Sequence, residues 1–194
     1  MAAGRSARFE DAPKQLVRFN GEPLVRLAAR ACLESLLCDT LLVTGHAASE
    51  VQRAVGDLPL KSISNPDFEE GKSASIRAGL RALPDSCDGA LFAPCDQPFL
   101  SAAVIDRIIG AFQRAKSQGL EPIVLPCHQG RKGAPALFDR RYFPELCSLT
   151  GEQGGRELME LHPSRIISVE LESERPLLDV DTPEELLNLE KLRD

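Results

Sequence analysis

Small side chains and positive charges are concentrated at the start of the chain. The run from Ala2 to Ser6 lets backbone N–H groups approach an anion closely, and nearby basic side chains add charge. This combination is typical of a loop that holds phosphate groups, and it predicts binding of a nucleoside triphosphate. A flexible basic arm is the alternative that this segment alone leaves open. The candidate phosphate-binding residues are Ala2, Ala3, Gly4, Arg5, Ser6, Arg8 and Lys14.

Two acidic residues follow apolar segments that are expected to be strands. Asp96 comes after the run 89–95 and before Gln97, and Asp181 comes after the run 177–180 and before a helical pattern. Mg²⁺ prefers oxygen ligands and needs only one or two carboxylates when a substrate supplies phosphate oxygens. Asp96 and Asp181 are therefore candidate magnesium ligands. The alternative is that each acid only caps a helix or turns the chain, and this alternative is stronger for Asp181.

A third segment with candidate binding residues lies between a predicted strand and a predicted helix. Asn65 follows the strand, Gly71 turns the loop, and Ser75 lies in the first turn of the helix. A flat base could stack over the backbone near Gly71 and form hydrogen bonds with Ser75. An ordinary helix start with Ser73 as its cap explains the same residues.

Apolar runs rich in β-branched residues alternate with helical patterns along the chain, which predicts a parallel sheet with helices on both faces. In such a sheet, ligands bind beyond the carboxyl ends of the strands, where both acids are expected. The whole chain, 1–194, is interpreted as one domain. The predicted strands are 40–44, 60–64, 89–94, 122–125, 165–171 and 177–180. The predicted helices are 23–37, 48–55, 72–83, 101–116, 154–161 and 183–192, with Ser101 and Thr182 as caps.

Composition narrows the class of protein. A formal net charge of −6 argues against general binding to nucleic acid or to a membrane surface. The six cysteines are far apart and are expected to be reduced thiols, and no apolar run is long enough to span a membrane. A cytoplasmic location is expected.

Six motifs follow one another along the chain. They are Ala-Ala-Gly-Arg-Ser-Ala-Arg-Phe with Lys14, Asn65 to Leu80, Pro-Cys-Asp-Gln-Pro, Gly-Arg-Lys-Gly-Ala-Pro, Thr-Gly-Glu-Gln-Gly-Gly-Arg and Leu-Asp-Val-Asp-Thr-Pro. In this order they resemble the MobA-like NTP-transferase family, and the branch they resemble most is that of the molybdenum cofactor cytidylyltransferases. The resemblance implies a three-layer α/β/α Rossmann-like nucleotidyltransferase sheet, mostly parallel, here with the N-terminal strand missing or truncated, because relatives usually have an apolar strand ahead of the first motif.

The resemblance implies a reaction and a role for each motif. CMP would pass from CTP to the phosphate of a molybdopterin-type cofactor, with release of pyrophosphate. Lys14, Asp96 and Asp181 would be catalytic, and the two aspartates would hold Mg²⁺ as the cofactor. Asn65, Gly71 and Ser75 would contact the nucleoside together with the small-residue loop. The acceptor would be bound by Arg131, Lys132, Gly133 and Arg156.

Three positions depart from the family pattern or bear on specificity. Alanine at Ala3, where guanylyl-transferring relatives have glycine, favours CTP as the donor. Cys95 replaces a frequent glycine before the acid, and Ala134 replaces a frequent polar residue before Pro135. A GTP-using or other small-phosphate nucleotidyltransferase is one alternative. A non-catalytic nucleotide- or cofactor-binding maturation factor is another, and a molybdoenzyme or its chaperone is the expected protein partner.

Overall fold

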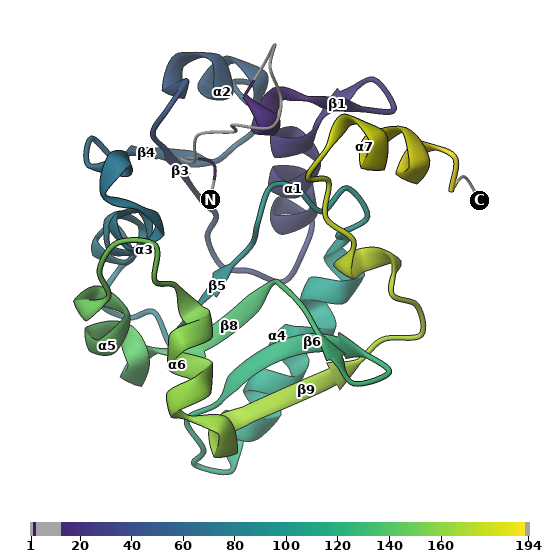
Figure 1. Cartoon of the computed structure of the whole chain (residues 1–194). Helices are drawn as coiled ribbons and strands as arrows, with labels where there is room; N and C mark the ends of the chain where they lie inside the picture. Colours follow the sequence, from purple (N-terminus) through teal and green to yellow (C-terminus); the bar gives the residue numbers. More distant parts are fainter. Residues whose placement is uncertain (1, 3–12, 193–194) are drawn as a thin grey trace.

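The computed structural model describes residues 2 and 13–192, and helices and strands alternate along the chain (Figure 1). The helices are α1 (Leu24–Leu33), α2 (Ala48–Ala54), α3 (Lys72–Arg81), α4 (Ala102–Ser117), α5 (Phe143–Ser148), α6 (Gly155–Leu161) and α7 (Pro183–Glu190). The strands are β1 (Arg18–Phe19), β2 (Glu22–Pro23), β3 (Leu41–Thr44), β4 (Lys61–Ser64), β5 (Gly89–Phe92), β6 (Ile123–His128), β7 (Arg131–Lys132), β8 (Ala136–Asp139) and β9 (Ile166–Glu170). A short 3₁₀ turn, η1 (Lys14–Leu16), begins the continuously described part.

The strands form three hydrogen-bonded groups. β1 and β2 make a small antiparallel ribbon, and β3 pairs with β4 in parallel. The largest group has the order β5-β8-β6-β7, with β9 also paired to β6. β8 runs antiparallel to both of its neighbours, whereas β6 and β9 are parallel. The sheet is therefore mixed rather than purely parallel.

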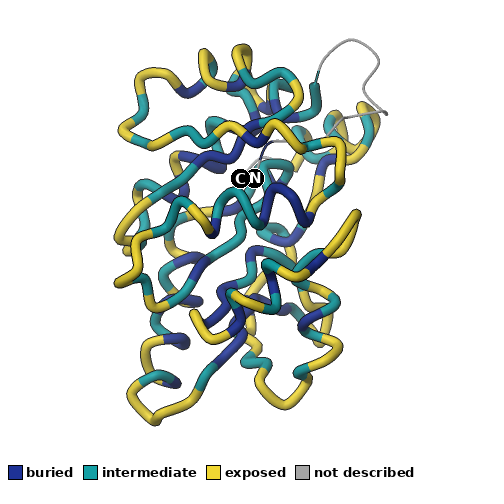
Figure 2. Tube along the Cα trace, turned by 90° about the vertical axis from the view of Figure 1, so that its left-hand side faces the viewer, coloured by how far each residue is buried: buried dark blue, intermediate teal, exposed yellow. Residues whose placement is uncertain are grey.

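Helices cover both faces of the large sheet, as the alternation of side chains along a strand requires. Ile123 of β6 packs in a cluster with residues of α3, α5 and α6. The next residue, Val124, points to the opposite face and packs with residues of α1 and α4. Figure 2 shows buried segments inside the molecule and exposed residues along its outer turns. The predicted α/β/α layering is confirmed.

The helix α4 shows how the pattern of apolar residues determines an element. Val104, Ile105, Ile108 and Phe112 lie on one face and are all buried. Ser101 is the N-cap residue of α4, as predicted, but its side chain makes no capping hydrogen bond. Its backbone carbonyl accepts the Ile105 N–H at 3.2 Å. Burial of the apolar face is enough to hold this helix.

Several other elements also differ from the prediction, including the short strands β1, β2 and β7, which were not predicted. The segment 177–180 is not a strand: Leu177 ends the 3₁₀ turn η5 (Arg175–Leu177), and the residues after it form no strand. The Val180 N–H donates a hydrogen bond to the Asp96 carbonyl at 2.8 Å. β8 and α5 were not predicted, because β8 is only four residues long and follows a Gly-Ala-Pro loop. Within the described residues, no helix combines the length and apolar character needed to cross a bilayer.

Candidate active site

Lys14 is the centre of a charged cluster. Its Nζ donates hydrogen bonds to Asp96 Oδ2 at 2.7 Å and to Asp181 Oδ1 at 2.6 Å. The side chains of Lys14, Asp96 and Asp181 are 18%, 27% and 50% exposed, so the cluster is sheltered on one side and open on the other. Residues that are 82 and 167 positions away in sequence therefore converge on one ammonium group.

Burial and neighbouring carboxylates shift the pKa of the Lys14 ammonium in opposite directions. Burial lowers its pKa, but the hydrogen bonds to Asp181 and Asp96 and their negative charges outweigh burial, so the pKa is raised overall. Lys14 is therefore positively charged at neutral pH. Such a charge can interact with phosphate oxygens that enter the open side of the cluster.

Local structure brings the two aspartates together. Asp96 follows β5, and its backbone carbonyl accepts the Val180 N–H at 2.8 Å, which joins the two segments. Asp181 directly precedes the start of α7. There the predicted Thr182 cap is confirmed, as part of a capping box: Thr182 Oγ1 accepts the Glu185 N–H, and Glu185 Oε2 accepts the N–H groups of Thr182 and Asp181. The backbone on either side of Asp181 is thus held in place.

A third acid, Asp179, belongs to the same region and was not among the predicted site residues. Desolvation raises its pKa, the Asp96 carboxylate adds to the rise, and a hydrogen bond with the Gln97 side chain opposes it. Gln97 itself is buried. The alternation Asp179-Val180-Asp181 was a usable signal, because residues two apart in an extended segment point to the same side.

The carboxylates of Asp96 and Asp181 also suit a divalent cation. Both carboxylates contact the one Lys14 Nζ, at 2.7 Å and 2.6 Å, so their oxygens lie close enough together to share a single cation. Among the described residues, no group of three or more His, Cys, Asp or Glu side chains could hold a metal. Two carboxylates are a ligand number that Mg²⁺ accepts when water and substrate phosphate complete its shell.

Of the predicted phosphate-binding loop, the structure describes Ala2 and Lys14. Ala2 is buried, its N–H donates to Val43 O at 2.9 Å, and its carbonyl accepts the side-chain amide of Gln15 at 3.0 Å. The latter bond links Ala2 to η1, where Lys14 lies. The remaining predicted residues, Ala3, Gly4, Arg5, Ser6 and Arg8, lie outside the described residues.

The predicted nucleoside contacts form a second cluster. Asn65 is buried, donates to Ser75 Oγ at 3.1 Å and accepts the Asp67 N–H at 3.1 Å. Its side chain is therefore held in one orientation. Ser73, the alternative cap, instead accepts a hydrogen bond from Arg77 Nη1 at 3.3 Å, and α3 begins one residue before it.

Gly71 joins this cluster to the loop before α6. Its φ of +102° is one that glycine adopts readily, and an added Cβ would lie 2.4 Å from the Gly151 carbonyl oxygen. The same carbonyl accepts the Ser73 N–H at 3.1 Å, and Arg77 Nη1 donates to Leu149 O at 2.8 Å. Two motifs about 80 residues apart, expected on the nucleoside and acceptor sides, thus pack against each other.

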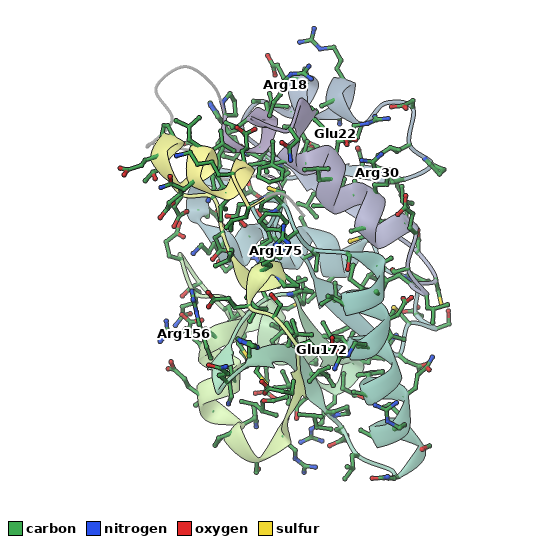
Figure 3. The ribbon with its side chains drawn as sticks, turned by 90° about the vertical axis from the view of Figure 1, so that its right-hand side faces the viewer. Arg18, Glu22, Arg30, Arg156, Glu172 and Arg175 are labelled. Atoms are coloured by element: carbon green, nitrogen blue, oxygen red, sulfur yellow. The ribbon has the colours of Figure 1, made fainter. Side chains whose placement is uncertain are left out.

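The predicted acceptor residues are dispersed. Arg131 and Lys132 form β7, where both are exposed. Arg131 Nη1 lies 3.7 Å from Glu174 Oε2. Gly133 packs closely against the Leu177 side chain. Arg156 is 85% exposed, pairs with Glu160, and lies at an outer edge of the molecule (Figure 3). The structure therefore brings Lys14, Asp96 and Asp181 together but does not gather the acceptor residues around them.

The mixed sheet with helices on both faces has the nucleotidyltransferase-like α/β fold. Two solved structures share this fold. One, from Mycobacterium sp. strain JC1, is a homologue of a Mycobacterium tuberculosis protein, with a TM-score of 0.82, 23% identity and coverage of 99% of this chain and 95% of the other. A nucleotidyl transferase from Methanothermobacter has a TM-score of 0.80, 22% identity and coverage of 98% and 93%. The family model described as "MobA-like NTP transferase domain" matches residues 1–166, and the chain belongs to this family.

Three curated relatives have similar levels of identity but different names. The nicotine blue oxidoreductase of Paenarthrobacter nicotinovorans is 29% identical, with 97% of this chain and 93% of the relative covered. A molybdenum cofactor guanylyltransferase of Vibrio atlanticus is 28% identical, with 96% and 91% covered. The molybdenum cofactor cytidylyltransferase of Escherichia coli is 25% identical, with 76% and 71% covered.

Proposed function

We propose that this protein transfers the nucleotidyl group of a nucleoside triphosphate, CTP, to the phosphate of a molybdopterin-type acceptor and releases pyrophosphate. The observation that carries the proposal is the position of Lys14 Nζ between the carboxylates of Asp96 and Asp181, at the carboxyl end of β5. Membership of the MobA-like family and the names of the molybdenum cofactor relatives support the kind of substrate.

The reaction requires positioning and charge stabilisation more than acid–base chemistry. The attacking phosphate oxygen is already ionised at neutral pH, so no general base has to act on it. The enzyme must hold two anions in line and stabilise the charge that moves onto the leaving pyrophosphate. Lys14 can supply that stabilisation, because its ammonium is charged and partly shielded from water.

Asp96 and Asp181 have two functions in this proposal. Until a substrate binds, they hold the Lys14 ammonium at the strand ends. Mg²⁺ bound by these carboxylates would neutralise phosphate charge. Asp179 belongs to the same acidic region, where desolvation and the Asp96 carboxylate raise its pKa.

The nucleoside and acceptor ends of the site are assigned by sequence motif and supported by packing. Asn65 and Ser75 are mutually hydrogen-bonded, and Gly71 touches the loop that precedes Arg156. This contact between the Gly71 turn and Gly151 supports assigning the two motifs to neighbouring donor and acceptor sites. Arg131, Lys132 and Gly133 remain the proposed contacts with the acceptor. A molybdoenzyme or its chaperone is the proposed recipient of the product.

The proposal also specifies which nucleoside triphosphate, CTP or GTP, is the donor. Ala3 favours CTP, whereas the guanylyltransferase name of the Vibrio relative favours GTP. Steady-state rates with CTP, GTP and ATP against one molybdopterin acceptor decide between them. A clearly higher kcat/KM for GTP would overturn the choice of CTP while leaving nucleotidyl transfer intact.

The class of reaction has its own test. The purified chain, molybdopterin, Mg²⁺ and CTP should release pyrophosphate in step with formation of the dinucleotide product. Lys14→Ala should lose both triphosphate affinity and turnover, whereas Lys116→Ala, which removes a different Lys–Asp pair at 2.7 Å, should keep them. Tight binding of both substrates without pyrophosphate release would support the non-catalytic maturation factor. Failure to bind any triphosphate would favour another activity, such as that named for the oxidoreductase relative.

A further inference from the structure

Asp181 lies in a connection that is neither strand nor helix. Residues 178–181 link the 3₁₀ turn η5 to the N-cap of α7. Such a connection lacks the ladder of hydrogen bonds that holds a strand, so the position of its side chains depends on what fixes its two ends. The Asp181 carboxylate nevertheless accepts a hydrogen bond from Lys14 Nζ at 2.6 Å. Contacts outside the connection must therefore contribute to its position.

Arg175, the first residue of η5, contacts two other segments. Its Cζ lies 4.6 Å from the centroid of the Phe99 ring, and Phe99 lies three residues after Asp96 in the loop that follows β5. Its Nη2 donates a hydrogen bond to the carbonyl of Leu192, beyond the end of α7. Figure 3 shows Arg175 below α7. One planar side chain thus connects η5, the loop after Asp96 and the end of α7.

The aromatic partner of Arg175 is itself fixed by packing. The Phe99 ring meets the Phe19 ring edge-on, with centroids 5.3 Å apart and an interplanar angle of 81°. Phe19 and Val180 are buried in one apolar cluster, and Phe99 packs against that cluster together with Leu186 of α7. A guanidinium can lie over an aromatic face while its N–H groups donate in its own plane. Phe99 therefore gives Arg175 a fixed surface, and the Leu192 carbonyl gives it a second point of attachment.

We propose that Arg175 is a positioning residue, which through Phe99 and the end of α7 keeps the Asp181 carboxylate within hydrogen-bond distance of Lys14. Its effect on turnover rests on the proposed function, whereas its effect on the position of Asp181 does not. Without these contacts, η5 and the end of α7 lose their shared attachment, and the connection between them can open more often. Catalysis by positioned charges is sensitive to displacements of about 1 Å, so turnover should fall more than triphosphate affinity.

Amide hydrogen exchange and steady-state kinetics with CTP, Mg²⁺ and molybdopterin test the proposal. Arg175→Ala removes both contacts, Arg175→Lys keeps the charge and one donor, and Phe99→Leu keeps an apolar side chain without the aromatic face. The matched control is Arg140→Ala. Arg140 Cζ lies 6.0 Å from the centroid of the Phe143 ring, and its Nη1 donates to two backbone carbonyls ahead of β5. This control loses contacts of the same kinds in another part of the fold.

In Arg175→Ala, the amides of Val180 and Asp181 should exchange about tenfold faster than in the unaltered chain. The kcat for pyrophosphate release should fall about tenfold, and the KM for CTP should change by less than about twofold. Arg175→Lys should recover part of both effects, and Phe99→Leu should shift both in the direction of Arg175→Ala. These two variants carry the test if Arg175→Ala does not fold. Arg140→Ala should leave the exchange of both amides and kcat unchanged.

Three results would overturn the proposal. Unchanged exchange of Val180 and Asp181 would show that Arg175 does not hold the connection. A raised KM with unchanged exchange would make Arg175 a direct contact of a substrate phosphate instead. Faster exchange with unchanged kcat would limit Arg175 to stabilising the fold. If the unaltered chain released no pyrophosphate, the proposed function would fail, but the exchange rates would still decide whether Arg175 positions Asp181.

Discussion

Replacing Lys14 with methionine tests the core of the proposed site. Lys14→Met keeps the length of the side chain but removes the charge that lies between Asp96 and Asp181. The two carboxylates then face each other without a cation. We expect the variant to be less stable, and we expect a divalent cation to restore its stability.

The size of the loss follows from exposure. Lys14 and Asp96 are 18% and 27% exposed, so their charged hydrogen bond is worth about 1–1.5 kcal/mol. Asp181 is half exposed, and its bond contributes less than about 1 kcal/mol because water screens it. A total near 2 kcal/mol corresponds to a drop of about 4–8 °C in the melting temperature of a chain of this size.

Thermal unfolding with and without Mg²⁺ measures both effects. Mg²⁺ should stabilise Lys14→Met more than the unaltered chain, because in the unaltered chain the ammonium competes for the same oxygens. The matched control is Lys116→Met, which removes the charge from the Lys116–Asp139 pair and should show no added response to Mg²⁺. The pH dependence follows from the raised pKa of Lys14: its contribution is fully present below about pH 10 and is lost as pH rises through the folded-state pKa.

Two results would refute this reasoning. If Mg²⁺ shifted the melting temperature of Lys14→Met and of the unaltered chain equally, the two carboxylates would not form the cation site. If Lys14→Met were as stable as the unaltered chain at pH 7, the hydrogen bonds of Lys14 would contribute no net stability.

Three further outcomes are expected. Asp96→Ala should abolish Mg²⁺-dependent pyrophosphate release while circular dichroism stays native, because its backbone bond to the 177–181 segment remains; near-normal turnover would remove Asp96 from the mechanism. Gly71→Ala should lower the free energy of unfolding by about 3 kcal/mol in a denaturant titration and raise the KM for triphosphate, because it adds backbone strain and a clash with Gly151. The control is Gly119→Ala: Gly119 also has a positive φ but open space around it, so this substitution should cost only about 1 kcal/mol. Arg156→Ala should leave stability within about 0.5 kcal/mol, and a raised KM for the acceptor alone would support its assignment; unchanged kinetics would assign it to the solvated surface.

Much of the fold was predictable because local signals and tertiary packing agree. α4 has an apolar face that recurs at helical spacing, and α7 begins at a capping box that its own residues complete. These features depend on neighbours within a few positions in the chain. β8, which lacks such local signals, was not predicted, and the segment 177–180 was wrongly predicted to be a strand.

The sequence by itself determined which chemical groups are available: a lysine near the start of the chain, an acid after β5 and an acid before α7. Only the tertiary structure decided that Asp96 and Asp181 share one ammonium, that Asp179 joins them, and that the Gly71 turn rests on Gly151. The physical reason is that hydrogen bonds and ion pairs depend on distances of about 3 Å. Spacing along the chain does not define such distances between segments 80 or more residues apart, whereas packing of strands and helices does.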